Sequence, residues 1–86
     1  MTFILHRSFE KKFVKLDPKL KAKFKERRNL FLQNQSHPLL NNHPLTGDRQ
    51  GQWSINITGN WRAIYEFKNK NTVVFVDINT HSNLYR

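Results

Sequence analysis

Two histidines, His43 and His81, and an arginine between them, Arg62, are the residues of this chain best suited to acid–base chemistry beside a negative charge. Imidazole titrates closest to neutral pH, so a pair of histidines can serve as base and acid. A guanidinium forks onto phosphate oxygens and can stabilise the charge that builds on a pentavalent phosphorus. Together the three residues predict a site that holds a phosphodiester and moves protons on it.

Each of these residues also has a plainer interpretation. A lone histidine in a loop is more often a surface or turn residue, and Arg62 could simply pair with Glu66 or with the C-terminal carboxylate. Zinc binding by His43, His81 and Asp77 is disfavoured, because no H-x-x-x-H or similar spacing accompanies them. We therefore expect neither a metal nor a cofactor.

The charge balance narrows the class of partner. Lys and Arg number 15 against six acids, a net charge of +9, and residues 1–35 carry +7 of it, from ten cations and three acids. Such an excess favours a polyanion such as nucleic acid, a ribosome or an acidic protein over a membrane surface. With no cysteine and no apolar run near the ~20 residues of a membrane span, we expect a soluble cytoplasmic protein with one domain over residues 1–86.

The basic half predicts a strand followed by two helices. Residues 2–7 suit a short strand, and Ser8 is a plausible cap for a helix with Phe9, Phe13 and Leu16 on one face. Asp17 can cap a second helix with Pro18 in its first turn, and this helix should run to about Gln35.

Cations flank the apolar stripe of the second helix on both sides. Such residues are usually just a solvated face, but six of them with one nearby acid create a strong local potential. The six that we expect to bind RNA are Lys19, Lys21, Lys23, Lys25, Arg27 and Arg28.

The second half predicts a loop over residues 36–51 and then three strands. Residues 53–57 and 61–67 alternate apolar and polar side chains. A three-residue loop, with Gly59 or Asn60 at positive φ, would pair Asn56 with Arg62 and put the large apolar side chains on one face. The run 72–78 is almost continuously apolar, as in a central strand, and the N-terminal strand could pair with it.

The predicted fold class is α+β: an N-terminal strand, an αα-hairpin and an antiparallel three-stranded meander. Helices should cover one face of the sheet, and both imidazoles and the guanidinium should converge above the other. An aromatic side chain could stack on a base there. The register assigns Trp61 to the core, which leaves Tyr85 as the better candidate.

Four segments of the chain carry a family resemblance: 42–47, 51–53, 57–65 and 77–85. The pieces Asn-His-Pro-Leu-Thr-Gly, Gly-Asn-Trp-Arg-Ala-Ile-Tyr and Asn-Thr-His-Ser-Asn-Leu-Tyr resemble the RelE/ParE toxin superfamily, and within it the YafQ-like toxins of bacterial type II toxin–antitoxin systems. The resemblance implies a microbial-RNase-like fold. It also implies an endoribonuclease that cuts mRNA on the ribosome without a metal, by attack of the ribose 2′-OH on the adjacent phosphate.

The resemblance assigns roles to individual residues. It implies that His43, His81 and Tyr85 belong to the active site and that Arg62 binds phosphate. Asn56 and Asn60 stand where YafQ-like enzymes often carry His and Asp. Neither amide can act as an acid or base near pH 7, so we expect these two residues to orient RNA.

The leading hypothesis from the sequence is therefore a toxin with endoribonuclease activity whose partners are an acidic antitoxin, the ribosome and mRNA. The order of the two histidines as base and acid stays open. The alternative is a ParE-like toxin that inhibits DNA gyrase without RNase activity. Gyrase inhibition by protein contact gives no reason for a pair of histidines. A plain RNA-binding scaffold is a third possibility.

Overall fold

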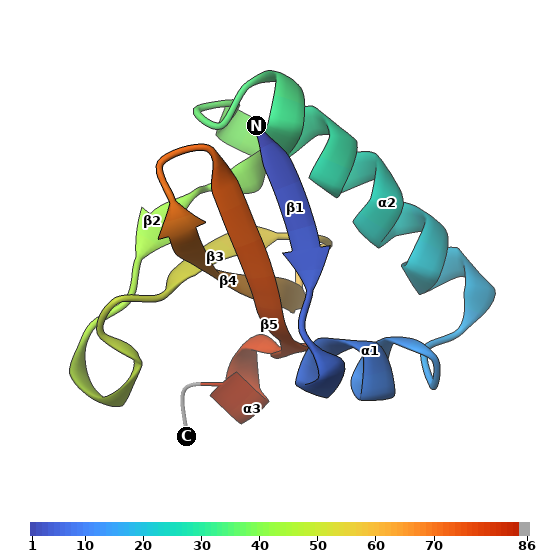
Figure 1. Cartoon of the computed structure of the whole chain (residues 1–86). Helices are drawn as coiled ribbons and strands as arrows, with labels where there is room; N and C mark the ends of the chain where they lie inside the picture. Colours follow the sequence, from blue (N-terminus) through green and yellow to red (C-terminus); the bar gives the residue numbers. More distant parts are fainter. Residues whose placement is uncertain (85–86) are drawn as a thin grey trace.

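The computed structural model describes residues 1–84. These residues form a sheet in the order β1-β5-β4-β3-β2 with helices packed on it (Figure 1). The elements in chain order are β1 (Thr2–Leu5), α1 (Arg7–Phe13), α2 (Pro18–Gln33), η1 (Pro38–Leu40), β2 (His43–Pro44), η2 (Gly47–Arg49), β3 (Trp53–Asn56), β4 (Trp61–Asn69), β5 (Thr72–Thr80) and α3 (His81–Leu84).

β5 is an interior strand with a neighbour on each side, as its apolar sequence predicts. β4 pairs with it in antiparallel fashion, and β1 pairs on its other side in parallel, from Thr2 opposite Thr72 to Leu5 opposite Phe75. Parallel strands need a long crossover, which the two helices and the rest of the sheet supply. The predicted pairing of the N-terminal strand with the run in β5 is confirmed.

An aromatic cluster joins the helices to one face of the sheet. The ring of Phe75 on β5 lies 5.9 Å from that of Phe9, 5.3 Å from Phe24 and 6.3 Å from Phe31, centroid to centroid. All four rings are almost completely buried. Because α1 and α2 both contribute to this cluster, they cover the same face of the sheet, and the loop after β2 lies on the far side (Figure 1).

The two helices begin differently. Asp17 caps α2 as predicted, since its Oδ1 accepts from the Leu20 N–H at 2.8 Å and Pro18 follows. The prediction of Ser8 as a cap is wrong: His6 caps α1 with its Nδ1, which accepts from the Ser8 N–H at 3.1 Å. The Ser8 hydroxyl instead donates to the Val76 carbonyl at 2.7 Å, so it fastens α1 to β5.

The hairpin of β3 and β4 has the predicted register. Asn56 lies opposite Arg62, and the Ile57 N–H donates to the Trp61 carbonyl at 2.9 Å. The expected positive φ at Gly59 or Asn60 is wrong, because within residues 1–84 only Asn41, Gly47 and Gly51 have it. The hydroxyl of Thr58 holds the turn instead, accepting from the N–H groups of Asn60 and Trp61 at 3.2 and 3.0 Å.

The segment predicted as a loop over residues 36–51 contains a further strand. β2 is only two residues long and pairs His43 with Ser54 and Pro44 with Trp53. Together with β1 it extends the predicted three-stranded meander to a five-stranded sheet. No helix in the described part of the chain is both long and apolar enough to cross a bilayer.

Tyr65 links the core to the segment that precedes β2. Its ring is buried in the sheet, and its hydroxyl donates to Asn42 Oδ1 at 2.8 Å. Burial raises the pKa of Tyr65 to about 12, and the bond to Asn42 opposes part of that rise. The neutral phenol is therefore the form that folding favours.

Replacing Tyr65 with Phe should lower the free energy of unfolding by about 1–2 kcal/mol near pH 8, because Asn42 Oδ1 loses its donor. The folded pKa lies above the ordinary value of 10, so this stabilisation is complete below pH 10 and is lost as pH rises toward 12. Between pH 10 and 12, the free energy of unfolding of the wild type should fall by up to ~1.4 kcal/mol per pH unit more than that of Tyr65→Phe. Urea titrations of both proteins from pH 8 to 12 measure this, and parallel curves would contradict it.

Candidate active site

The face of the sheet opposite the helices carries two cross-strand rows of side chains. Paired residues in neighbouring strands point to the same side. One row is Asn56, Arg62 and Asn79, and the other is His43, Ser54, Ile64 and Asp77. The prediction that Arg62 lies opposite the core face is confirmed, and His43 shares the face of Arg62.

His43 is held in one tautomer by the backbone. Its Nδ1 lies 2.7 Å from the Asn41 carbonyl oxygen. A carbonyl can only accept, so Nδ1 carries the proton, and Nε2 of the neutral ring is left with a lone pair. The half-buried ring lines an open hollow of about 410 Å³ with Leu45, Arg49 and Leu84 among its other walls. This arrangement suits a group that accepts a proton.

The turn before His43 explains that contact. Asn41 has φ 44°, a left-handed conformation that asparagine tolerates better than most residues. Its N–H donates to the Pro38 carbonyl at the end of η1, while its own carbonyl meets the imidazole two residues on. Asn42 is fixed in turn by Tyr65 and by its bond to the Gln35 carbonyl at 3.3 Å.

Asp77 fixes the loop that forms a wall of this hollow. Its carboxylate accepts from Lys12 Nζ at 2.6 Å and from Arg49 Nη2 at 3.0 Å, so it ties α1 to the loop containing η2 across β5. Arg49 also donates to Gln52 Oε1 at 3.0 Å. The sequence offered Asp77 only as a metal ligand, and within residues 1–84 no three His, Asp or Glu side chains gather as a metal site would require.

Arg62 is directed at the β3–β4 turn. Its Nη1 donates to the carbonyls of Thr58, Gly59 and Trp61 at 3.0, 3.3 and 3.1 Å, and its Nη2 donates to Gly59 at 3.3 Å. Glu66 is not its partner, because that carboxylate accepts from Gln52 at 2.9 Å. Nε makes no hydrogen bond within residues 1–84, so this edge of the guanidinium can meet a further acceptor.

The same turn also meets His81. The backbone N–H of His81 donates to the Asn60 carbonyl at 2.7 Å, at the point where β5 gives way to α3. Asn60, Arg62 and His81 therefore lie around one turn, with Asn56 opposite Arg62. His43 lies two strand spacings from β4, roughly 10 Å at the backbone. The structure thus brings the backbone of His81 to the turn that Arg62 binds, and it places His43 farther across the same face.

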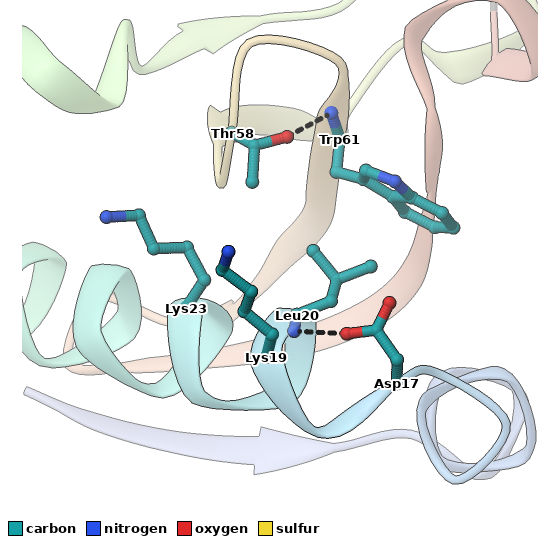
Figure 2. A pocket seen from close by; sticks show the side chains of 6 residues that line it. All are labelled: Asp17, Lys19, Leu20, Lys23, Thr58 and Trp61. Atoms are coloured by element: carbon teal, nitrogen blue, oxygen red, sulfur yellow. Dashed lines mark hydrogen bonds between the residues drawn. The ribbon is translucent and has the colours of Figure 1, made fainter.

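The predicted RNA-binding cations of α2 separate into two groups. Lys19 and Lys23 extend toward Thr58 and line a hollow of about 350 Å³ that Trp61 and Leu20 also line (Figure 2). Arg27 lines another hollow beside the same turn. Lys21 is half-buried and Lys25 is exposed.

Arg28 is occupied by contacts within the fold. Its guanidinium carbon lies 4.6 Å from the centroid of the Phe3 ring, and it donates to Asn29 Oδ1 at 3.1 and 3.2 Å. Tyr85 lies outside the described residues, so its role stays a prediction.

Comparison with known proteins identifies the family. The family model described as "Bacterial toxin of type II toxin-antitoxin system, YafQ" matches residues 1–86. The chain belongs to this YafQ toxin family. The resemblance inferred from the sequence motifs is therefore confirmed.

Individual relatives of this toxin agree with the family. A stretch of 27 residues is 56% identical to the endoribonuclease HigB of Proteus vulgaris, but it spans only 31% of this chain and 29% of that protein. Among solved structures, E. coli YafQ superposes with a TM-score of 0.75 at 23% identity, over 98% of this chain and 97% of that one. A YoeB/ParE toxin from Agrobacterium tumefaciens gives 0.76 at 20% identity, over 94% and 99%. At these identities the superpositions establish the shared α+β fold.

Replacing Asp77 with Asn should lower the free energy of unfolding by about 1–3 kcal/mol, because the change weakens two charge-assisted bonds at a mostly buried carboxylate. The matched control is Glu26→Gln, which breaks the exposed Lys23–Glu26 pair at 3.5 Å and should cost no more than about 1 kcal/mol. Urea unfolding of both variants makes the comparison. Equal losses would show that Asp77 does not anchor the loop.

Proposed function

We propose that this toxin is an endoribonuclease that cleaves mRNA on the ribosome by metal-independent acid–base chemistry. The observation that carries the proposal is His43, which has its Nδ1 proton fixed by Asn41 and lines a hollow on the face that also bears Arg62. Membership of the YafQ family and the stretch shared with the endoribonuclease HigB support the same activity.

In the proposed reaction, Nε2 of His43 takes the proton of the ribose 2′-hydroxyl. The 2′-oxygen then forms a bond to the adjacent phosphorus while the bond from phosphorus to the 5′-oxygen breaks. His81 in its protonated form gives its proton to the departing 5′-oxygen. The products are a 2′,3′-cyclic phosphate and a 5′-hydroxyl. The fixed tautomer of His43 is the reason for assigning it as the base.

Arg62 stabilises the reacting phosphate in this scheme. Since its Nη1 is held by turn carbonyls, the guanidinium is positioned before substrate arrives, and Nε is the donor directed to a phosphate oxygen. Asn56 and Asn60 flank this position and orient the RNA by hydrogen bonds without titrating. Tyr85 stacks on a neighbouring base.

The partners follow from charge and family. The cations of α2 face ribosomal RNA, and a cognate antitoxin neutralises the toxin. A solved E. coli relative is a DinJ–YafQ toxin–antitoxin complex, 24% identical with a TM-score of 0.75. An acidic antitoxin segment that covers Arg62 would complement the net charge of +9.

Cleavage should fall about 10²- to 10⁴-fold in His43→Gln and in His81→Gln, the range expected when a general acid or base is removed. The matched control is His37→Asn. His37 caps η1 through its Nδ1, and Asn preserves a capping side chain, so this variant should cleave like the wild type. Primer extension measures the rates on a message that is incubated with each protein in the presence and in the absence of translating ribosomes.

Further substrates and assays separate the mechanism from its alternatives. A 2′-deoxy substitution at the cleaved nucleotide should abolish cutting there, because the proposed attacking hydroxyl is then missing. If both histidine variants retain full activity, the site is wrongly assigned. If the wild type leaves RNA intact but blocks supercoiling by DNA gyrase, the ParE-like alternative replaces this proposal.

A further inference from the structure

A second cationic group lies beside the proposed active site and has no partner within the fold. Arg27 of α2 lines a hollow of about 170 Å³ with Leu39, Asn56 and the turn residues Thr58 and Gly59. The remaining lining residue is Ile57, so no carboxylate from residues 1–84 contributes to the hollow. Arg27 forms no ion pair with any residue in the range 1–84.

The guanidinium of Arg27 is largely removed from solvent without compensation. Its Nε and Nη1 are buried and meet no acceptor in residues 1–84, whereas Nη2 is not among the buried atoms. Burying charged donors without acceptors is unfavourable, and the electrostatic field of such a group is poorly screened. An anion that reaches Nη2 therefore gains more than it would from a lysine in open solvent.

Asn56 lines the same hollow. Its Oδ1 is buried and unpaired, while its Nδ2 is not among the buried atoms and makes no hydrogen bond within the described chain. Arg27 Nη2 and Asn56 Nδ2 are thus two side-chain donors of the residues that line this hollow that are neither fully buried nor hydrogen-bonded within residues 1–84. Two donors, one of them charged, beside a hollow that no described carboxylate lines, fit an anionic acceptor.

The position of the hollow indicates which anion. Asn56 is the cross-strand partner of Arg62, and Arg62 binds the carbonyls of Thr58 and Gly59, which also line the hollow. Arg27 and Arg62 therefore flank the same turn. Lys23 and Lys19 lie one and two helical turns before Arg27 on α2 and reach the other side of Thr58 (Figure 2).

We propose that Arg27 and Asn56 form a second phosphate subsite, which takes the RNA phosphate next to the one held by Arg62. The α2 row of Lys23 and Lys19 then continues the path of the backbone away from the reacting bond. This inference rests on the proposed RNA substrate. Because binding can be measured without cleavage, the subsite and the proposed nuclease activity can fail separately.

A titration of the wild-type protein tests the subsite with inorganic phosphate as the probe. In ¹⁵N-labelled full-length protein, the Nε–H resonance of Arg27 is identified by its absence from Arg27→Lys. It should shift saturably with added phosphate and stay in place with chloride at equal ionic strength. No shift, or the same shift in chloride, overturns the proposal. A shift with a polyglutamate peptide but not with phosphate also overturns it and assigns the hollow to an acidic protein.

RNA binding tests the subsite with a 2′-O-methyl oligonucleotide, which cannot be cleaved by 2′-hydroxyl attack. Arg27→Gln should weaken binding about tenfold and reduce the slope of log affinity against log salt by about 0.7, the loss of one single-strand phosphate contact. Lys70→Gln removes the same charge from the exposed β4–β5 turn and should leave the slope unchanged. Wild-type affinity and slope in Arg27→Gln would refute the subsite even if cleavage occurs as proposed.

Discussion

The β3–β4 turn is the constraint on which the candidate site depends. The hydroxyl of Thr58 accepts from two backbone N–H groups of the turn, and the outward carbonyls of Thr58 and Gly59 accept from Arg62. The Asn60 carbonyl then receives the backbone N–H of His81. One three-residue segment thus sets the strand register, orients the guanidinium and fixes the start of α3, so a change there would move several functional groups together.

Four of the six acids of the chain accept hydrogen bonds or form ion pairs within the fold. Asp17 caps α2, Asp77 binds two cations, Glu66 accepts from Gln52 and Glu26 pairs with Lys23. Lys19 and Arg27, in contrast, line hollows that the fold leaves open. The contacts of these acids offset only part of the positive charge, and the net charge of +9 favours the approach of a polyanion.

The elements predicted correctly are those that a strong apolar pattern specifies. A slip of one residue between β3 and β4 would have placed Ile55 and Ile57 on the polar face, so the pairing of Asn56 with Arg62 followed from alternation alone. β5 was recognisable for the same reason. β2 was not, because two residues are too short to show a period, and its pairing depends on the left-handed Asn41.

The features that could not be predicted from the sequence are contacts of polar side chains with residues far away in the chain. His6 rather than Ser8 caps α1 because the Ser8 hydroxyl finds the Val76 carbonyl, 68 positions away. Asp77 became an anchor only when Lys12 and Arg49 met it from two other elements. The unpaired donors of Arg27 likewise appear only when helix and turn are packed together, since composition alone marks this residue as one surface cation among many.

The parallel pairing of β1 with β5 has a consequence for biosynthesis. The hydroxyls of Thr2 and Thr72 meet at 2.9 Å, although the ribosome adds these residues 70 positions apart. Until β5 has left the exit tunnel, β1 has no neighbour, Phe9, Phe24 and Phe31 lack Phe75, and α1 lacks the carbonyl of Val76. Because such distant contacts form late, a nascent chain cannot assemble this sheet, and the toxin reaches its folded form only after nearly all of its residues have been added.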